Sequence, residues 1–294
     1  MINLNIAGAV VHYDAFSKQL PILKLTNKNI ALNVYEGPNL CQWNGGRINR
    51  DIVLTDEMIQ KYNKHGITIS LTFTNPTIDL SDSIGNDLLL RLNKSQQMYN
   101  IRNKIVLVNE ELRQYIRKNY PDFELIYSIT GHPSNTKITD ELLQRYVDLE
   151  FKYDWVVPKF ENVFEPKFYN TIDPSKYELL INDTCIYSCP HYHEHFSKIA
   201  EQNTISKNPW KELGHDHCFK VEECWLDWFN PDEGCKKHKD KFGERMGMDF
   251  TREMIKKAIN IGYKSFKISG RENSTDYIMY EVRKFYNDIN ERSK

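Results

Sequence analysis

The chain has 294 residues, of which 40% are hydrophobic and 27% charged, and it carries a formal net charge of −1. This composition is that of a soluble globular protein, long enough for one large α/β barrel or two ordinary domains. The near-neutral charge gives no overall field that would attract a membrane or a nucleic acid, although a local basic groove for RNA is compatible with it.

Short apolar runs rich in β-branched residues recur along the chain and alternate with segments of helical periodicity. The runs predict strands at residues 6–11, 30–35, 67–74, 104–108, 123–129, 155–158, 177–181 and 265–268. Helices are predicted at residues 55–65, 87–99, 110–119, 139–151, 251–260 and 277–289. Thr55 and Thr139 are in the right place to cap two of these helices.

Repeated strand-then-helix units require parallel pairing, with the helices outside the sheet. Eight such units in a chain of this size favour a closed (β/α)₈ barrel of the TIM type over an open sheet. The Gly-x-Gly-x-x-Gly signature of dinucleotide-binding sheets does not follow the first strand, and no linker rich in Pro, Gly or Ser divides the chain. The prediction is one barrel domain, residues 1–294, with a cysteine-rich insertion at residues 185–246 after the seventh strand.

The carboxyl ends of the strands meet on one face of such a barrel, and this face carries the chemistry. The residues predicted there are Glu36, Asn75, Asn109, Lys159, Asn182, Asp183, Gly270 and Arg271. The cysteine-rich insertion leaves the seventh strand at the same face. We therefore expect any metal that it binds to lie at the active site.

The insertion at residues 185–246 contains five of the six cysteines and six of the nine histidines. No basic leader followed by an apolar run begins the chain, and no window approaches the roughly 20 apolar residues of a membrane-spanning helix. We therefore expect a cytoplasmic protein with no membrane segment. Thiols stay reduced in the cytoplasm, so these cysteines favour a metal or an iron–sulfur cluster over disulfides.

Four thiolates complete the ligand set of a [4Fe–4S] cluster, whereas three leave one iron open. The predicted ligands are Cys185, Cys189, Cys218 and Cys224. The first two lie four residues apart, which suits one loop, and the other two return from a second segment. Cys235 competes for the fourth place. Cys41 is expected to be a buried small residue or a partner near the barrel mouth.

The histidines give a zinc alternative. Residues 191–195 hold three alternating histidines, and residues 215–217 hold two more beside Cys218. Mixed cysteine and histidine sets bind zinc tetrahedrally. The Cys-x-x-Cys spacing of zinc ribbons and fingers is absent, so the spacing alone leaves the cluster and zinc both open.

Two stretches carry a family resemblance. Residues 181–196 run from Ile-Asn-Asp-Thr-Cys185 through Cys189-Pro190 to His195-Phe196, and residues 262–271 read Gly-Tyr-Lys-Ser-Phe-Lys-Ile-Ser-Gly-Arg. Both resemble motifs of the peptidase U-thirty-two family, the collagenase-like peptidases. The stretch Asn44-Gly45-Gly46-Arg47 and the strand ending at Asn75 match that family in the same order.

The resemblance implies a TIM-type barrel that carries an oxygen-sensitive [4Fe–4S] cluster on cysteines. Better-understood members act in oxygen-independent hydroxylation of transfer-RNA uridine, ribosomal-RNA cytidine or the ubiquinone ring, with prephenate implicated as the hydroxyl source in some. The cysteine spacing of this chain matches no one subgroup. RNA and a small aromatic molecule are therefore both retained as predicted substrates.

Lys267 and Arg271 lie at the end of the last strand, where barrels often bind phosphate or carboxylate groups. Arginine suits bidentate recognition of an anion and lysine supplies a point charge. The alternative is a structural ion pair with Glu272 or Glu36. His195 is expected to hydrogen-bond a cluster ligand rather than to act as an acid or base, and no catalytic residue is assigned.

The leading hypothesis is an iron–sulfur enzyme that performs an oxygen-independent hydroxylation or a related modification. The alternative is a zinc-stabilised binding or scaffold subunit of a modification complex, with a protein partner. A metal-dependent peptidase comes third, because Gly-x-Ser-x-Gly and His-Glu-x-x-His are absent. The spacing in His193-Glu194-His195 does not place both imidazoles on one helix face.

Overall fold

The computed structural model describes residues 1–38, 40–46, 53–133, 137–183, 192–205, 248–270 and 273–290. The strands are β1 (Ile2–Ala7), β2 (Ile30–Glu36), β3 (Thr68–Phe73), β4 (Lys104–Leu107), β5 (Glu124–Tyr127), β6 (Trp155–Val156), β7 (Glu178–Asp183), β8 (Met248–Asp249) and β9 (Ser265–Ile268). The helices are α1 (Tyr13–Thr26), α2 (Asp56–Lys64), α3 (Ser83–Tyr99), α4 (Glu110–Asn119), α5 (Asp140–Lys152), α6 (Pro166–Tyr169), α7 (Tyr192–Ile205), α10 (Arg252–Ile261) and α11 (Thr275–Asn290). Short 3₁₀ turns are η1 (Ile129–Gly131), η2 (Phe160–Asn162) and η3 (Pro174–Lys176).

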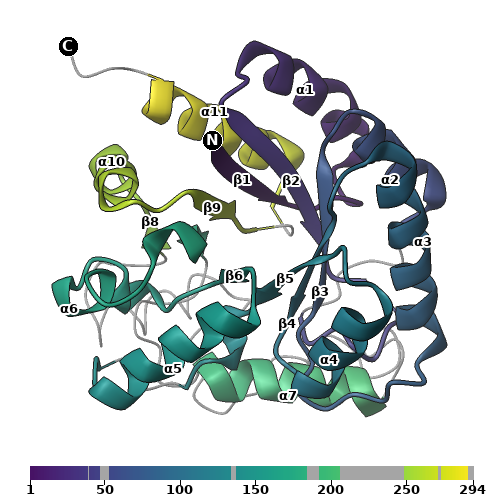
Figure 1. Cartoon of the computed structure of the whole chain (residues 1–294). Coiled ribbons are helices and arrows are strands. Elements are labelled where there is room, and N and C mark those ends of the chain that lie inside the picture. Colours follow the sequence, from purple (N-terminus) through teal and green to yellow (C-terminus); the bar gives the residue numbers. More distant parts are fainter. Residues whose placement is uncertain are drawn as a thin grey trace, which may run out of the picture.

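Eight of these strands form a nearly closed parallel barrel (Figure 1). The strand order is β6-β5-β4-β3-β2-β1-β9-β7, and every neighbouring pair in this order is parallel. A single parallel bridge between Val156 and Tyr177 joins β6 to the residue before β7 and brings the two edges together. The predicted TIM-type barrel is therefore confirmed.

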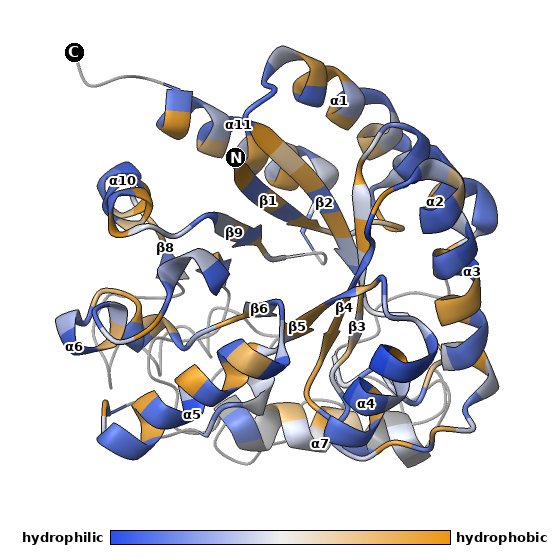
Figure 2. Ribbon diagram, viewed as in Figure 1, coloured by the Kyte–Doolittle hydropathy of each residue, from blue (hydrophilic) through white to orange (hydrophobic). Residues whose placement is uncertain are grey.

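The alternation of side chains along the strands creates two distinct cores. Outward residues such as Leu32, Ile69 and Phe266 belong to one large apolar cluster that the surrounding helices complete, with the Phe266 and Phe285 rings 5.2 Å apart. A second, small cluster lies inside the barrel around Val106 and Ile126. Figure 2 shows β4 and β5, which carry these two residues, as mostly hydrophobic ribbon.

Two helices begin at the capping residues that the sequence predicted. The Thr55 hydroxyl accepts a hydrogen bond from the Met58 amide at 3.3 Å, and the Thr139 hydroxyl accepts one from the Leu142 amide at 3.2 Å. These bonds satisfy amides that have no partner inside the first turn of a helix. Both predicted caps are confirmed.

The first strand lies earlier in the chain than predicted, at Ile2–Ala7 instead of residues 6–11. Gly8 ends it, because its φ of +90° lies in the left-handed region and a Cβ there would meet the His12 ring at 2.3 Å. Ala9 and Val10 are buried in the loop that follows, so their apolar character reflects packing and not strand structure.

Several further elements were not predicted, among them α1, α6, α7 and β8. Helix α1 contains Pro21, which breaks the sequence signal for a helix. Strand β8 has only two residues and pairs antiparallel with β7, and α7 lies inside the cysteine-rich insertion. No helix within the described ranges combines the length and the apolar character that crossing a membrane requires.

His132 helps to close the barrel where its sheet is weakest. Strands β5 and β6 share only two paired positions, and His132 Nε2 lies 2.9 Å from the carbonyl oxygen of Val157, just beyond β6. A carbonyl only accepts, so Nε2 carries a proton. The side chain is fully buried against Tyr127 and Tyr146, and this burial lowers its pKa to about 3, so the ring is neutral near pH 7.

We expect this histidine to make the fold sensitive to mild acid. The unfolded chain takes up the His132 proton near the usual pKa of 6.5, whereas the folded chain does so only near 3. Between these values the unfolded state holds more protons, so stability rises with pH by up to about 1.4 kcal/mol per pH unit from this group. Urea unfolding of a His132→Gln variant between pH 4 and 6.5 should therefore show a flatter slope than wild type. A His65→Gln variant is the exposed control, and equal slopes for His132→Gln and wild type would contradict the assignment.

Candidate functional site

The residues predicted at the carboxyl ends of the strands do gather at the barrel mouth. Glu36 ends β2, Asn75 follows β3, Asn109 follows β4, Lys159 follows β6, and Asn182 lies at the end of β7. Gly270 follows β9 with a φ of +101°. Arg271 lies outside the described residues, as do the side chains of Asp183 and His195.

Two of these residues stabilise the loops at the mouth. The buried Glu36 carboxylate accepts hydrogen bonds from the Val10 and Gly37 amides, both at 3.1 Å. Asn109 caps α4 by accepting from the Leu112 amide at 2.9 Å. Both side chains thus shape the mouth through contacts with backbone.

Asn75 fastens helix α7 across the mouth. Its side-chain nitrogen donates to the Gln42 carbonyl at 2.6 Å, to the Ala200 carbonyl at 3.2 Å and to the Thr204 hydroxyl at 2.9 Å. The side chain is 1% exposed, so these bonds form away from water. At the other end of the helix, His193 Nδ1 lies 3.3 Å from the Thr130 carbonyl oxygen.

Helix α7 also closes the apolar side of the barrel. Phe196 packs against the interior cluster of Val106, Ile126, Ile129 and Val157, which β4 to β6 and the turns after them supply. Beside it, a pocket of about 270 Å³ opens between the ends of β3 to β5 and the helix. Its wall includes Thr74, Asn109, Thr130, His193, Phe196 and Ser197. The β4–β6 side of the mouth thus combines an apolar floor under Phe196 with a pocket whose wall is mostly polar.

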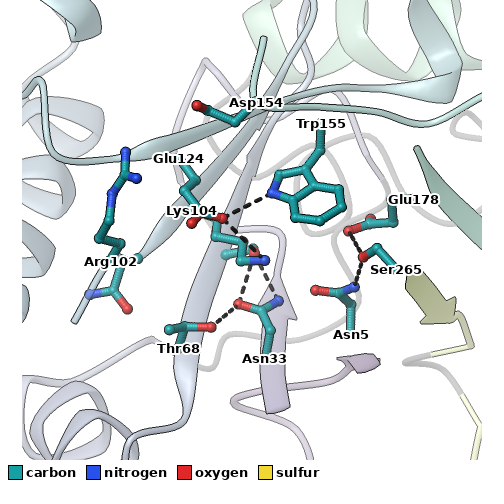
Figure 3. Close-up of polar contacts among 12 residues, drawn as sticks. Asn5, Asn33, Thr68, Arg102, Lys104, Glu124, Asp154, Trp155, Glu178 and Ser265 are labelled. Atoms are coloured by element: carbon teal, nitrogen blue, oxygen red, sulfur yellow. Dashed lines mark hydrogen bonds and ion pairs between the residues drawn. The ribbon is translucent and has the colours of Figure 1, made fainter. Parts of the chain in front are cut away.

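Polar side chains fill the amino-terminal part of the barrel interior (Figure 3). On one side, Asn33 donates to the Ser70 hydroxyl at 2.9 Å. Next to it, Lys104 Nζ lies 3.4 Å from Glu124 Oε2, which also accepts from the Trp155 indole at 3.0 Å. Lys104 is 5% exposed, so the carboxylate and the indole face, 5.3 Å away, replace the water around its charge.

A second polar group extends from this layer towards the mouth. Glu178, which begins β7, lies 3.6 Å from Lys267 Nζ and accepts from the Ser265 hydroxyl at 3.4 Å. Asn5 donates to Ser265 at 3.0 Å. The Lys267 ammonium lies 4.2 Å from the centre of the Tyr35 ring. Lys267 thus has a structural role beside any part in binding, and its carboxylate partner Glu178 was missed by sequence reasoning.

The β7 and β9 ends are joined by Asn182 and Ser269. The Ser269 amide donates to Asn182 Oδ1 at 2.6 Å, and Asn182 Nδ2 donates to the Ser269 carbonyl at 3.3 Å. The Ser269 hydroxyl donates to the Asn182 carbonyl at 2.7 Å. The sequence predicted Asn182 at the barrel mouth but not its pairing with Ser269. A polar residue at an inward-facing position of a mostly apolar strand is the sequence signal that could have indicated this role.

All the predicted cluster ligands lie outside the described residues. Among the residues that the structure does describe, no group of three or more His, Cys, Asp or Glu side chains could hold a metal. Cys41 is buried and its thiol donates to Asp82 at 3.3 Å. Burial, with the Asp82 charge beside it, raises the pKa of the Cys41 thiol, which keeps it protonated. This agrees with the prediction of a buried small residue.

Comparison with known proteins supports the fold. No protein-family model matches the chain, and no curated protein matches it. A solved structure described as that of the U32 peptidase Mk0906 is similar over 92% of this chain and 94% of its own, with a TM-score of 0.53 and 10% sequence identity. At this identity the likeness concerns the fold alone, and the fold is the barrel that the family resemblance implied.

The Glu178–Lys267 pair gives a test of the polar interior. A Lys267→Met substitution would leave Glu178, whose side chain is 1% exposed, without the cation beside it. Loss of one partner of a buried pair costs about 3–5 kcal/mol, and adding Glu178→Gln should recover most of that loss. Urea unfolding measures both effects. Lys167→Met, which breaks an exposed pair with Asp140, is the control and should cost under about 1 kcal/mol. Equal costs for the two single variants would show that the buried pair contributes no more to the free energy of unfolding than the exposed one.

Asn75 gives a test of how α7 is held. Asn75→Ala removes the donor shared by Gln42, Ala200 and Thr204, so we expect α7 to lose about 1–3 kcal/mol of local stability. Hydrogen–deuterium exchange should become faster at residues 192–205. Asn63→Ala is the matched control, because Asn63 is also 1% exposed but bonds Asn103 near the start of β4. Unchanged exchange in α7 after Asn75→Ala would rule out this anchor.

Proposed function

We propose that this chain is an iron–sulfur enzyme that performs an oxygen-independent hydroxylation or related modification of RNA or a small aromatic molecule. In this proposal a [4Fe–4S] cluster is held at the barrel mouth. Its ligands are Cys185, Cys189, Cys218 and Cys224. Lys267 and Arg271 bind an anionic group of the substrate or of the oxygen donor.

The observation that carries the proposal is the pairing of β7 with β8. Asn182 pairs with Asp249 and Asp183 with Met248, so the cysteine-rich insertion leaves and re-enters the barrel at one place. That place is the carboxyl end of β7, on the face where barrels of this type carry out chemistry. In the sequence, Cys185 follows Asp183 by two residues and Cys189 precedes α7 by three. This short separation supports a cluster at the mouth.

The donor chemistry also supports a cluster. The thiolates of the insertion are the donors that iron–sulfur clusters use. When bound, the cluster would supply one-electron redox chemistry. The barrel would supply the surroundings, because Phe196 of α7 packs over the apolar cluster on the β4–β6 side.

The anion site follows from β9. Lys267 is on this strand, with its side chain 12% exposed, and Arg271 is the residue after Gly270. Gly270, in a left-handed conformation, turns the chain at the end of the strand, and Arg271 follows it directly in the sequence. A phosphate or carboxylate bound there would compete with Glu178 for Lys267, and Arg271 would supply the second cationic side chain.

Metal analysis of protein purified without oxygen tests the proposal. We expect about four irons and four acid-labile sulfides per chain, with the visible absorption of a cubane cluster. Single Cys→Ala changes at Cys185 and Cys189 should each lower the iron content. Cys41→Ser is the matched control, because it keeps the hydrogen bond to Asp82 and should leave the iron unchanged.

Other results would decide against the cluster. Stoichiometric zinc without sulfide would favour the zinc-stabilised binding or scaffold subunit, and a search for its protein partner would follow. Iron that is unchanged in both the Cys185→Ala and the Cys189→Ala variant would remove these two cysteines from the ligand set. If the cluster is present, transfer-RNA, ribosomal-RNA and quinone-ring substrates distinguish the two substrate classes.

A further inference from the structure

Asn182 is bonded to β9 more extensively than strand pairing requires. The regular β7–β9 ladder shifts its register between Leu180 and Asn182 and ends at Ile268. Beyond that point, the Asn182 side-chain amide pairs with both backbone groups of Ser269, accepting from the amide at 2.6 Å and donating to the carbonyl at 3.3 Å. The amide side chain thus acts as one more rung after the ladder has ended.

Two further contacts fix the same residue. The Ser269 hydroxyl donates to the Asn182 carbonyl at 2.7 Å. On its other side, the Asn182 backbone pairs with Asp249 of β8. Asn182 is 5% exposed, so water does not compete for these bonds. One residue therefore joins β7, β8 and β9 at the mouth.

The Asn182–Ser269 bonds lie close in the sequence to both parts of the proposed site. Asn182 is three residues before Cys185, and Ser269 is two residues before Arg271. The bonds between them set the distance between the strand end that leads into the cysteines and the strand end that leads to the anion site. Groups that orient a metal ligand from outside the ligand set commonly affect metal affinity by about 10–100-fold.

We propose that Asn182 is a positioning residue: with Ser269 it holds the carboxyl end of β7 against β9 so that the cluster ligands that follow it are preorganised. This inference rests on the proposed function, because it concerns how an iron–sulfur cluster is retained. The role belongs to the side-chain amide, since only a group that both donates and accepts can pair with a whole peptide unit.

The test compares Asn182→Ala with Asn5→Ala in the full chain, purified without oxygen. Asn5 is a matched control, because it is 1% exposed and also donates twice to β9, to the Ser265 hydroxyl at 3.0 Å and the Phe266 carbonyl at 3.1 Å. It lies in the strand interior, away from the mouth. Both variants should lower the melting temperature, whereas only Asn182→Ala should lose iron to a chelator, about tenfold faster than wild type.

A second pair of variants keeps the test decisive if Asn182→Ala does not fold. Ser269→Ala removes the hydroxyl bond to the Asn182 carbonyl, and Ser269→Thr restores a hydroxyl at the same position. We expect faster iron loss in Ser269→Ala and rescue in Ser269→Thr, with the reduction potential of the remaining cluster shifted only in Ser269→Ala.

The remaining outcomes separate failure of the positioning role from failure of the proposed function. Equal iron loss in Asn182→Ala and Asn5→Ala would show general destabilisation and overturn the positioning role. Wild-type rates of iron loss in Asn182→Ala and in Ser269→Ala would overturn it as well. Absence of iron and sulfide from wild type would instead refute the proposed function itself, and the inference with it.

Discussion

Closure of the parallel sheet is the constraint on which the rest of this molecule depends. A parallel sheet must be covered on both faces, and its two edge strands stay unpaired unless the sheet closes into a barrel. Here the two edges meet through few backbone contacts. Strand β6 has two residues, and one bridge between Val156 and Tyr177 links it to the residue before β7. Side chains compensate for the missing ladder bonds. His132 reaches the Val157 carbonyl from the turn after β5, and the Tyr146 hydroxyl accepts from the Lys159 amide on the far side of β6.

Closure also divides the interior into two unlike halves. Inward side chains of β4 to β6 are apolar near the mouth and are covered by Phe196 of α7. On β7, β9 and β1, the inward side chains Glu178, Lys267 and Asn5 are polar and are linked through Ser265 and the Glu178–Lys267 ion pair. Polar groups also line the pocket beside Phe196, among them Asn109, His193 and Ser197. The mouth therefore carries polar side chains on both sides, and the cysteine-rich insertion begins and ends on the side of β7 and β9.

The sequence predicted most of the barrel because outward strand positions need apolar, β-branched residues whatever the function. Seven strands lie within a few residues of their predicted positions, and the first was misplaced because the apolar run at Ala9 and Val10 packs as a loop after Gly8 turns the chain. The site was predicted less completely. The mouth residues follow from strand ends alone, but the Glu178–Lys267 pair joins residues far apart in the sequence. Such a pair depends on which strands become neighbours when the barrel closes. A local sequence pattern does not predict which strands those are.

The anchors around the insertion bear on how it would bind a cluster. Bringing two ligands together costs conformational entropy that grows with the length of chain between fixed points. Strand β7, held by Asn182, and helix α7, held by Asn75, are two such points, and the stretch between them, residues 184–191, contains Cys185 and Cys189. Cys218 and Cys224 belong to the longer stretch 206–247 between α7 and β8. If the cluster binds as proposed, the first pair of thiolates meets the smaller entropic cost, so it would bind iron first and the second pair would complete the site.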